Sequence, residues 1–165
     1  MNYLISAILV GLGATVVMDL WVAVRGWLFG IAPPNYCFVG RWVAHMPQGR
    51  FRHQRIASAT RKRGECAIGW TAHYLIGVAF AGLLIGFSGL EWIQRPTVAP
   101  ALSIGIGTVL APFLLMQPGM GAGLAASKMP NPAAARLQSL VTHSIFGLGL
   151  YASAWLAQPL LLKLN

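Results

Sequence analysis

Long uncharged stretches alternate with short basic ones along this chain of 165 residues. Asp19 is the only charged residue before Arg25, and residues 66–90, 96–127 and 137–162 carry no charge at all. Each stretch reaches the roughly 20 residues that an α-helix needs to cross about 30 Å of hydrocarbon. The pattern predicts an all-α fold, a polytopic four-transmembrane-helix bundle. The spans are expected at about residues 3–27, 67–91, 97–118 and 134–162, within a single domain over residues 1–165.

The composition agrees with a membrane protein, because 56% of the residues are hydrophobic and only 9% are charged. The first span lacks a basic leading region and a small-x-small cleavage site, so we expect it to be retained rather than removed as a signal peptide. We find no nucleophile–base pair, phosphate-binding loop or HExxH motif, and no aqueous segment is long enough for a conventional active site. The sequence therefore does not predict an enzyme.

The distribution of the basic residues predicts the orientation of the spans. Ten lie between spans one and two or between spans three and four, and only Arg95 and Lys163 lie on the other side. The positive-inside rule then places the basic loop 31–65 in the cytoplasm and both termini outside it. The net charge of +9 is thus a topology signal, and we predict no nucleic-acid partner. Cys37 and Cys66 would lie in or beside this cytoplasmic loop, where thiols stay reduced, so no disulfide is expected.

Basic, aromatic and aliphatic residues alternate irregularly in the loop 31–65. We interpret it as a segment on the headgroups of the bilayer, with Trp42, Phe51 and Ile56 dipping into the lipid and His45 and His53 on the same wetted surface. A phosphate site is disfavoured because no glycine-rich cradle accompanies the arginines. Six basic residues are the candidates for contact with anionic lipid: Arg50, Arg52, Arg55, Arg61, Lys62 and Arg63.

Short similarities suggest that the chain is two duplicated helical hairpins. The stretch GLGATVV (residues 11–17) resembles GIGTVL (residues 105–110), and His73 and His143 are each followed four positions later by glycine. Under this duplication Thr108 corresponds to Thr15, and Pro112 occupies the position equivalent to Asp19. The two halves would share one orientation and be related by an axis along the membrane normal.

Polar residues within spans are expensive and normally face the interior of a helix bundle with a partner. Counted from the nearest cytoplasmic charge at about 1.5 Å per residue, Asp19 lies roughly 9 Å, His73 roughly 12 Å and His143 roughly 10 Å into the membrane. Thr15 lies one turn from Asp19 on the same face. These depths predict an intramembrane Asp/His site near the cytoplasmic side.

The chemistry of this layer is open among four interpretations. The polar residues of the layer can simply form a buried hydrogen bond that fixes helix register. The layer can bind or translocate a small solute or ion with proton coupling, through Asp19, His73, His143, Thr15 and Thr108, in which case four spans imply a homodimer. The layer can also bind haem b, ligated by His73 and His143, or a transition metal, ligated by the two histidines and Asp19. Alternatively, the chain is an accessory subunit of a larger membrane complex.

Three segments carry a resemblance to a known family: TVVMDLW (15–21), MQPGMGAGLAASKMPNP (116–132) and THSIFGLGLY (142–151). With them the chain resembles a family of small uncharacterised bacterial inner-membrane proteins that has only a domain-of-unknown-function label. The resemblance implies a bacterial plasma membrane and four spans. It supplies no activity, ligand or functional residue.

Overall fold

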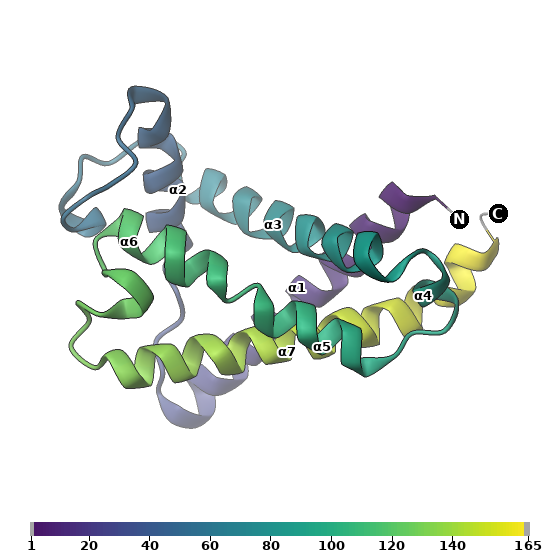
Figure 1. Cartoon of the computed structure of the whole chain (residues 1–165). Helices are drawn as coiled ribbons and strands as arrows, with labels where there is room; N and C mark the ends of the chain where they lie inside the picture. Colours follow the sequence, from purple (N-terminus) through teal and green to yellow (C-terminus); the bar gives the residue numbers. More distant parts are fainter. Residues whose placement is uncertain (1, 164–165) are drawn as a thin grey trace. The chain divides into compact units, whose positions relative to one another are not determined.

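The computed structural model describes residues 2–163, which are mainly helical and contain no strand. Four segments are long and apolar enough to cross a membrane: α1 (Tyr3–Phe29), α3 (Glu65–Ser88), the segment Val98–Met120 and α7 (Pro132–Lys163) (Figure 1). The prediction of an all-α membrane protein with four spans is confirmed, and the predicted bounds differ from the observed ones by at most three residues.

The third span is interrupted. It begins as α5 (Val98–Gly107), passes through a π-helical turn η3 (Pro112–Met116) and ends as α6 (Gln117–Met120). Pro112 has no N–H to donate to the preceding turn, and a proline ring clashes with the carbonyl four residues earlier. The wider turn at Pro112 is the local response that this chemistry favours.

Short elements connect the long ones. The chain between α1 and α3 forms α2 (Tyr36–His45) and the 3₁₀ turns η1 (Met46–Gln48) and η2 (Ile56–Ser58). A short α4 (Glu91–Gln94) follows α3, and η4 (Leu124–Ala126) precedes α7. Asn131 caps α7, because its side-chain oxygen accepts a hydrogen bond from the backbone N–H of Ala134 at 3.1 Å, and Pro132 is the first helical residue.

The chain divides into two compact units. The first, which we name the core unit, comprises described residues 2–33, 74–108 and 141–163 and contains the main hydrophobic cluster. The second, named the loop unit, comprises Pro34–His73 and Val109–Leu140. Three of the four long segments contribute to both units. The single-domain organisation stays a prediction.

Helices of the core unit approach one another at small residues. A Cβ atom added to Gly11 of α1 would lie 2.5 Å from Cα of Val78 in α3, and one added to Gly149 of α7 would lie 3.0 Å from the carbonyl oxygen of Ala14. Larger side chains on α1 point outward instead, since Leu4 is 62% exposed. On α1, small residues therefore lie inside and leucines such as Leu4 lie outside, as in helices that pack within lipid.

Candidate functional site

Asp19 and Thr15 lie one turn apart on α1 and both face α3. The hydroxyl of Tyr74 donates a hydrogen bond of 3.0 Å to Oδ2 of Asp19. Thr15 is fully buried, and its hydroxyl donates to the carbonyl of Gly11 at 2.8 Å. A Cβ atom at Gly77 of α3 would collide with Oγ1 of Thr15. The absence of a side chain at Gly77 therefore gives the Thr15 hydroxyl its space.

His143 on α7 is held by the end of α5. Its Nδ1 lies 3.1 Å from Oγ1 of Thr108 and 3.3 Å from the carbonyl oxygen of Gly105. The Thr108 hydroxyl already donates to that same carbonyl at 2.7 Å. We therefore assign the ring proton to Nδ1, which donates to both oxygens. In the neutral ring, Nε2 is then the nitrogen that can accept a proton or bind a ligand.

The close contacts of the two predicted hairpins are of the same kind. In the first hairpin Gly11 of α1 meets Gly77 of α3, and in the second Gly105 of α5 meets Gly147 of α7. A Cβ atom at Gly105 would lie 2.6 Å from the backbone nitrogen of Gly147. Thr15 and Thr108 each donate to the carbonyl of the glycine one turn earlier. These are the pairs of positions that the proposed duplication relates, and they support it.

His73 belongs to the loop unit, as its last residue before the chain continues into the core unit. Its ring stacks on Tyr36 of α2 with centroids 4.1 Å apart and lies edge-on to Trp70 at 5.8 Å. The sequence predicted the depth of His73 but not this aromatic group. Within residues 2–163, no group of three or more His, Cys, Asp or Glu side chains could hold a metal ion.

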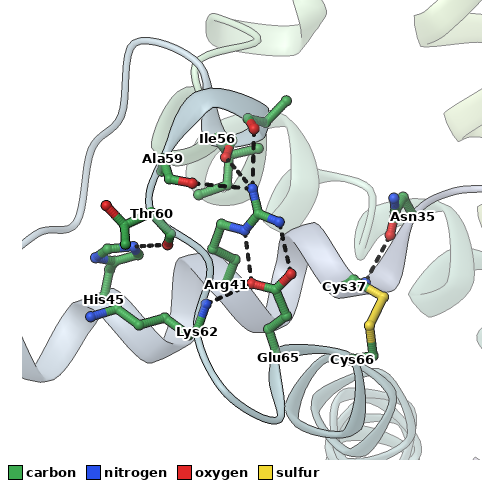
Figure 2. Close-up of polar contacts among 11 residues, drawn as sticks. Asn35, Cys37, Arg41, His45, Ile56, Ala59, Thr60, Lys62, Glu65 and Cys66 are labelled. Atoms are coloured by element: carbon green, nitrogen blue, oxygen red, sulfur yellow. Dashed lines mark hydrogen bonds and ion pairs between the residues drawn. A yellow bond between two sulfur atoms is a disulfide. The ribbon is translucent and has the colours of Figure 1, made fainter.

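Arg41 is the main polar connection of the loop unit, and sequence reasoning missed it. Its Nε and Nη2 donate to the two carboxylate oxygens of Glu65 at 2.8 and 2.7 Å, and the Glu65 hydrogen bond raises the pKa of Arg41. Nη1 donates to the carbonyls of three residues of the 56–59 segment (Figure 2). A usable signal was present, because Glu65 is the only acidic residue in the loop 31–65.

The expectation of two reduced cysteines is wrong, because Cys37 and Cys66 form a disulfide (Figure 2). Their Cα atoms are 3.9 Å apart. This proximity follows from the crossing of α2 and α3 at two glycines, since a Cβ atom at Gly40 would lie 2.6 Å from the backbone nitrogen of Gly69. The prediction considered only the reducing character expected of the cytoplasm. The sequence alone does not show that α2 and α3 lie side by side.

Two details of the predicted headgroup segment are also wrong. Ile56 is only 6% exposed and packs within the protein rather than reaching lipid. His45 is 2% exposed, its Nε2 lies 3.0 Å from the carbonyl oxygen of Thr60, and its ring meets that of His53 edge-on at 5.0 Å. The segment folds on itself because the buried face of α2, which includes Val39, Arg41 and His45, packs and hydrogen-bonds within the loop unit. Of the six candidate lipid-binding residues, Lys62 donates a hydrogen bond to the side chain of Gln48. The other five are exposed: Arg50, Arg52, Arg55, Arg61 and Arg63.

The comparisons with known proteins give one match. The sequence profile of a family described as "Protein of unknown function (DUF2938)" matches residues 8–157, which confirms the resemblance to an uncharacterised family. The matched region contains α2, both cysteines and every residue of the candidate intramembrane site. No curated protein and no solved structure matches the chain.

Proposed function

We propose a function for this chain from the residues of its candidate site. The chain belongs to DUF2938, a family of unknown function, so the family itself supplies no activity. The protein binds or translocates a small solute or ion with proton coupling, at an intramembrane site that includes Asp19 and His143. Its setting is the bacterial inner membrane, with both termini outside the cytoplasm. Four spans form a thin pathway for one chain, so the working form is a homodimer.

The observation that carries this proposal is the way in which α5 holds His143. Two hydrogen-bond acceptors fix the Nδ1 proton, and all hydrogen bonds of the ring within the described chain are made by Nδ1. Imidazole is the side chain that most often serves as a proton shuttle in proteins. Nε2 can therefore take up and release a proton while the ring keeps its orientation.

Asp19 supplies the second proton-exchanging group. Its carboxylate accepts a hydrogen bond from Tyr74, which keeps it on the side of α1 that faces α3. A carboxylate within a span is expensive, and the groups that remain there commonly belong to ion pathways and proton relays. Thr15, one turn away, and Thr108, beside His143, provide hydroxyl oxygens that a small polar solute or cation can contact.

A solute-driven pH change in proteoliposomes tests the proposal. Liposomes loaded with a pH-sensitive dye receive gradients of amino acids, small carboxylates, sugars and monovalent cations. We expect at least one gradient to drive a pH change with the wild type, and Asp19→Asn and His143→Gln to abolish it. Glu91→Gln, in the short α4, is the matched control and keeps it. An unchanged response in Asp19→Asn, or no response to the whole panel, contradicts the proposal.

Ligation of haem b or a metal by His143 is the second candidate, and one feature favours it. Histidines that bind metals commonly donate their other ring N–H to a carbonyl or carboxylate, as Nδ1 of His143 does to Gly105. Purified protein supplied with haem is expected to develop a Soret band that His143→Gln weakens. A spectrum without such a band removes haem, and equal metal content in wild type and His143→Gln removes a metal.

A further inference from the structure

We propose that Cys37 and Cys66 form a redox-active couple that exchanges electrons with an external dithiol. This activity is independent of the proton-linked site, because it uses only residues of the loop unit. These two residues are the only cysteines of the sequence. Three features of the loop unit carry the inference: the access to the sulfur atoms, the contacts that hold the pair together and the helix ends on which it lies.

Access to the disulfide is unequal. Cys66 is exposed and Cys37 is half-buried, so an external thiolate reaches the sulfur of Cys66 first. Exposed disulfides are commonly the labile or catalytic ones, whereas structural disulfides resist reduction. Aromatic side chains stand beside the pair, with Tyr36 preceding Cys37 and its ring 4.6 Å from that of Trp70, one turn after Cys66. They provide an apolar surface next to a reactive sulfur.

The two cysteines are held together by contacts that do not involve sulfur. Arg41, one turn after Cys37, forms the two-pronged ion pair with Glu65, the neighbour of Cys66 (Figure 2). The side chains of this pair are 4% and 12% exposed, so water competes little with them. The backbones of α2 and α3 also meet at Gly40 and Gly69. Reduction therefore leaves two thiols side by side, ready to close again.

Both cysteines lie in the first turn of a helix. Cys37 is the second residue of α2, and its backbone N–H donates a 3.0 Å hydrogen bond to the side chain of Asn35, which caps the helix. Cys66 is the second residue of α3. The N-terminal end of a helix stabilises a thiolate and lowers the pKa of a cysteine there. Glu65 would oppose this effect, but Arg41 neutralises its charge. The reduced form is thereby favoured relative to an ordinary dithiol.

The reaction is a pair of thiol–disulfide exchanges. A thiolate of the external dithiol attacks Sγ of Cys66, the bond to Sγ of Cys37 breaks, and Cys37 leaves as a thiolate at the start of α2. The second thiolate of the partner then attacks the mixed disulfide and releases Cys66 as a thiolate. The partner loses two electrons and becomes a disulfide. The protein gains two electrons, and the solvent exchanges the protons.

Redox titration of the full-length protein in nanodiscs tests the proposal. Glutathione buffers of varied ratio, followed by acid trapping and a mass-adding maleimide, separate the disulfide from the dithiol. We expect both forms to be populated, and the same ratio to be reached from the reduced and the oxidised side. A reduced CxxC dithiol protein should reduce the couple, with one partner dithiol oxidised for each disulfide reduced. A disulfide that persists in every buffer until the protein is unfolded overturns the proposal and identifies a static cross-link.

Two variants test the geometry. Arg41→Lys removes the two-pronged contact and is expected to lower the equilibrium constant of disulfide formation about tenfold, whereas Arg95→Lys, at an exposed arginine outside the loop unit, leaves it unchanged. Equal constants for the two variants overturn the role of the ion pair. In single-cysteine proteins, the thiol of Cys66 in Cys37→Ser should react with an aromatic disulfide reagent faster than that of Cys37 in Cys66→Ser. The reverse order overturns attack at Cys66.

Discussion

Substitution of Gly105 by alanine tests whether the contact between α5 and α7 controls both the stability and the site. The added Cβ would lie 2.6 Å from the backbone nitrogen of Gly147 and 2.8 Å from the carbonyl oxygen of His143, whereas ordinary contacts begin near 3.4 Å. Because Cα of Gly147 lies closer still to the added Cβ, the two backbones must separate by at least 0.8 Å, the difference between 3.4 Å and 2.6 Å. Overpacking of this kind costs about 1–3 kcal/mol.

Gly107→Ala is the matched control, because a Cβ atom there meets nothing within 4 Å. Both variants gain the helix propensity of alanine, at most about 1 kcal/mol, so their difference reports the contact alone. We expect the melting temperature of Gly105→Ala to fall roughly 3–10 °C below that of Gly107→Ala, measured by tryptophan fluorescence in detergent. The separation would also lengthen the bond from His143 to Gly105. Equal melting temperatures would refute the reasoning.

Three further predictions concern single contacts. Tyr74→Phe removes the hydrogen bond to Asp19 and is expected to shift the carboxylate band of Asp19 in infrared difference spectra, and an unchanged band would show that Tyr74 does not bind it. Asn131→Ala removes the cap of α7 and should cost about 1 kcal/mol in thermal unfolding, with no loss contradicting the cap. Reduction of the disulfide, which spans a sequence separation of 29, should cost about 3.5 kcal/mol by chain entropy, visible as a lower melting temperature of the protein kept in reductant.

The spans were predictable because they depend on local composition. A run of about 20 uncharged residues has few alternatives to a membrane helix, and caps such as Asn131 act within one turn. Thr15 was found by its one-turn spacing from Asp19 and Thr108 by the internal similarity of the two hairpins, and the hydroxyl of each bonds a carbonyl three or four residues earlier. Depth along a helix also follows from counting, which is why Asp19 and His143 were singled out before their partners were known.

The contacts of the loop unit were not predictable in this way. Arg41 and Glu65 are 24 residues apart, and nothing local pairs that arginine rather than a neighbouring one with the single carboxylate. The burial of Ile56 and His45 depends on how α2 packs within its unit, so a pattern of mixed polarity was interpreted as a lipid surface. The hydrogen bond from Tyr74 to Asp19 depends on α1 and α3 lying side by side, which the sequence alone does not show.

The disulfide and the basic loop together constrain how the protein can work. The loop charges predict that α2 and the disulfide lie in the cytoplasm, where persistent cross-links are rare and those that occur are usually transient, catalytic or redox-sensing. If the loop instead faced an oxidising compartment, a static disulfide would be ordinary there. Sidedness and redox behaviour are therefore coupled expectations. An impermeant maleimide that labels reduced Cys66 only in inverted membrane vesicles would support both, and labelling only in right-side-out vesicles would contradict the predicted topology and favour a structural cross-link.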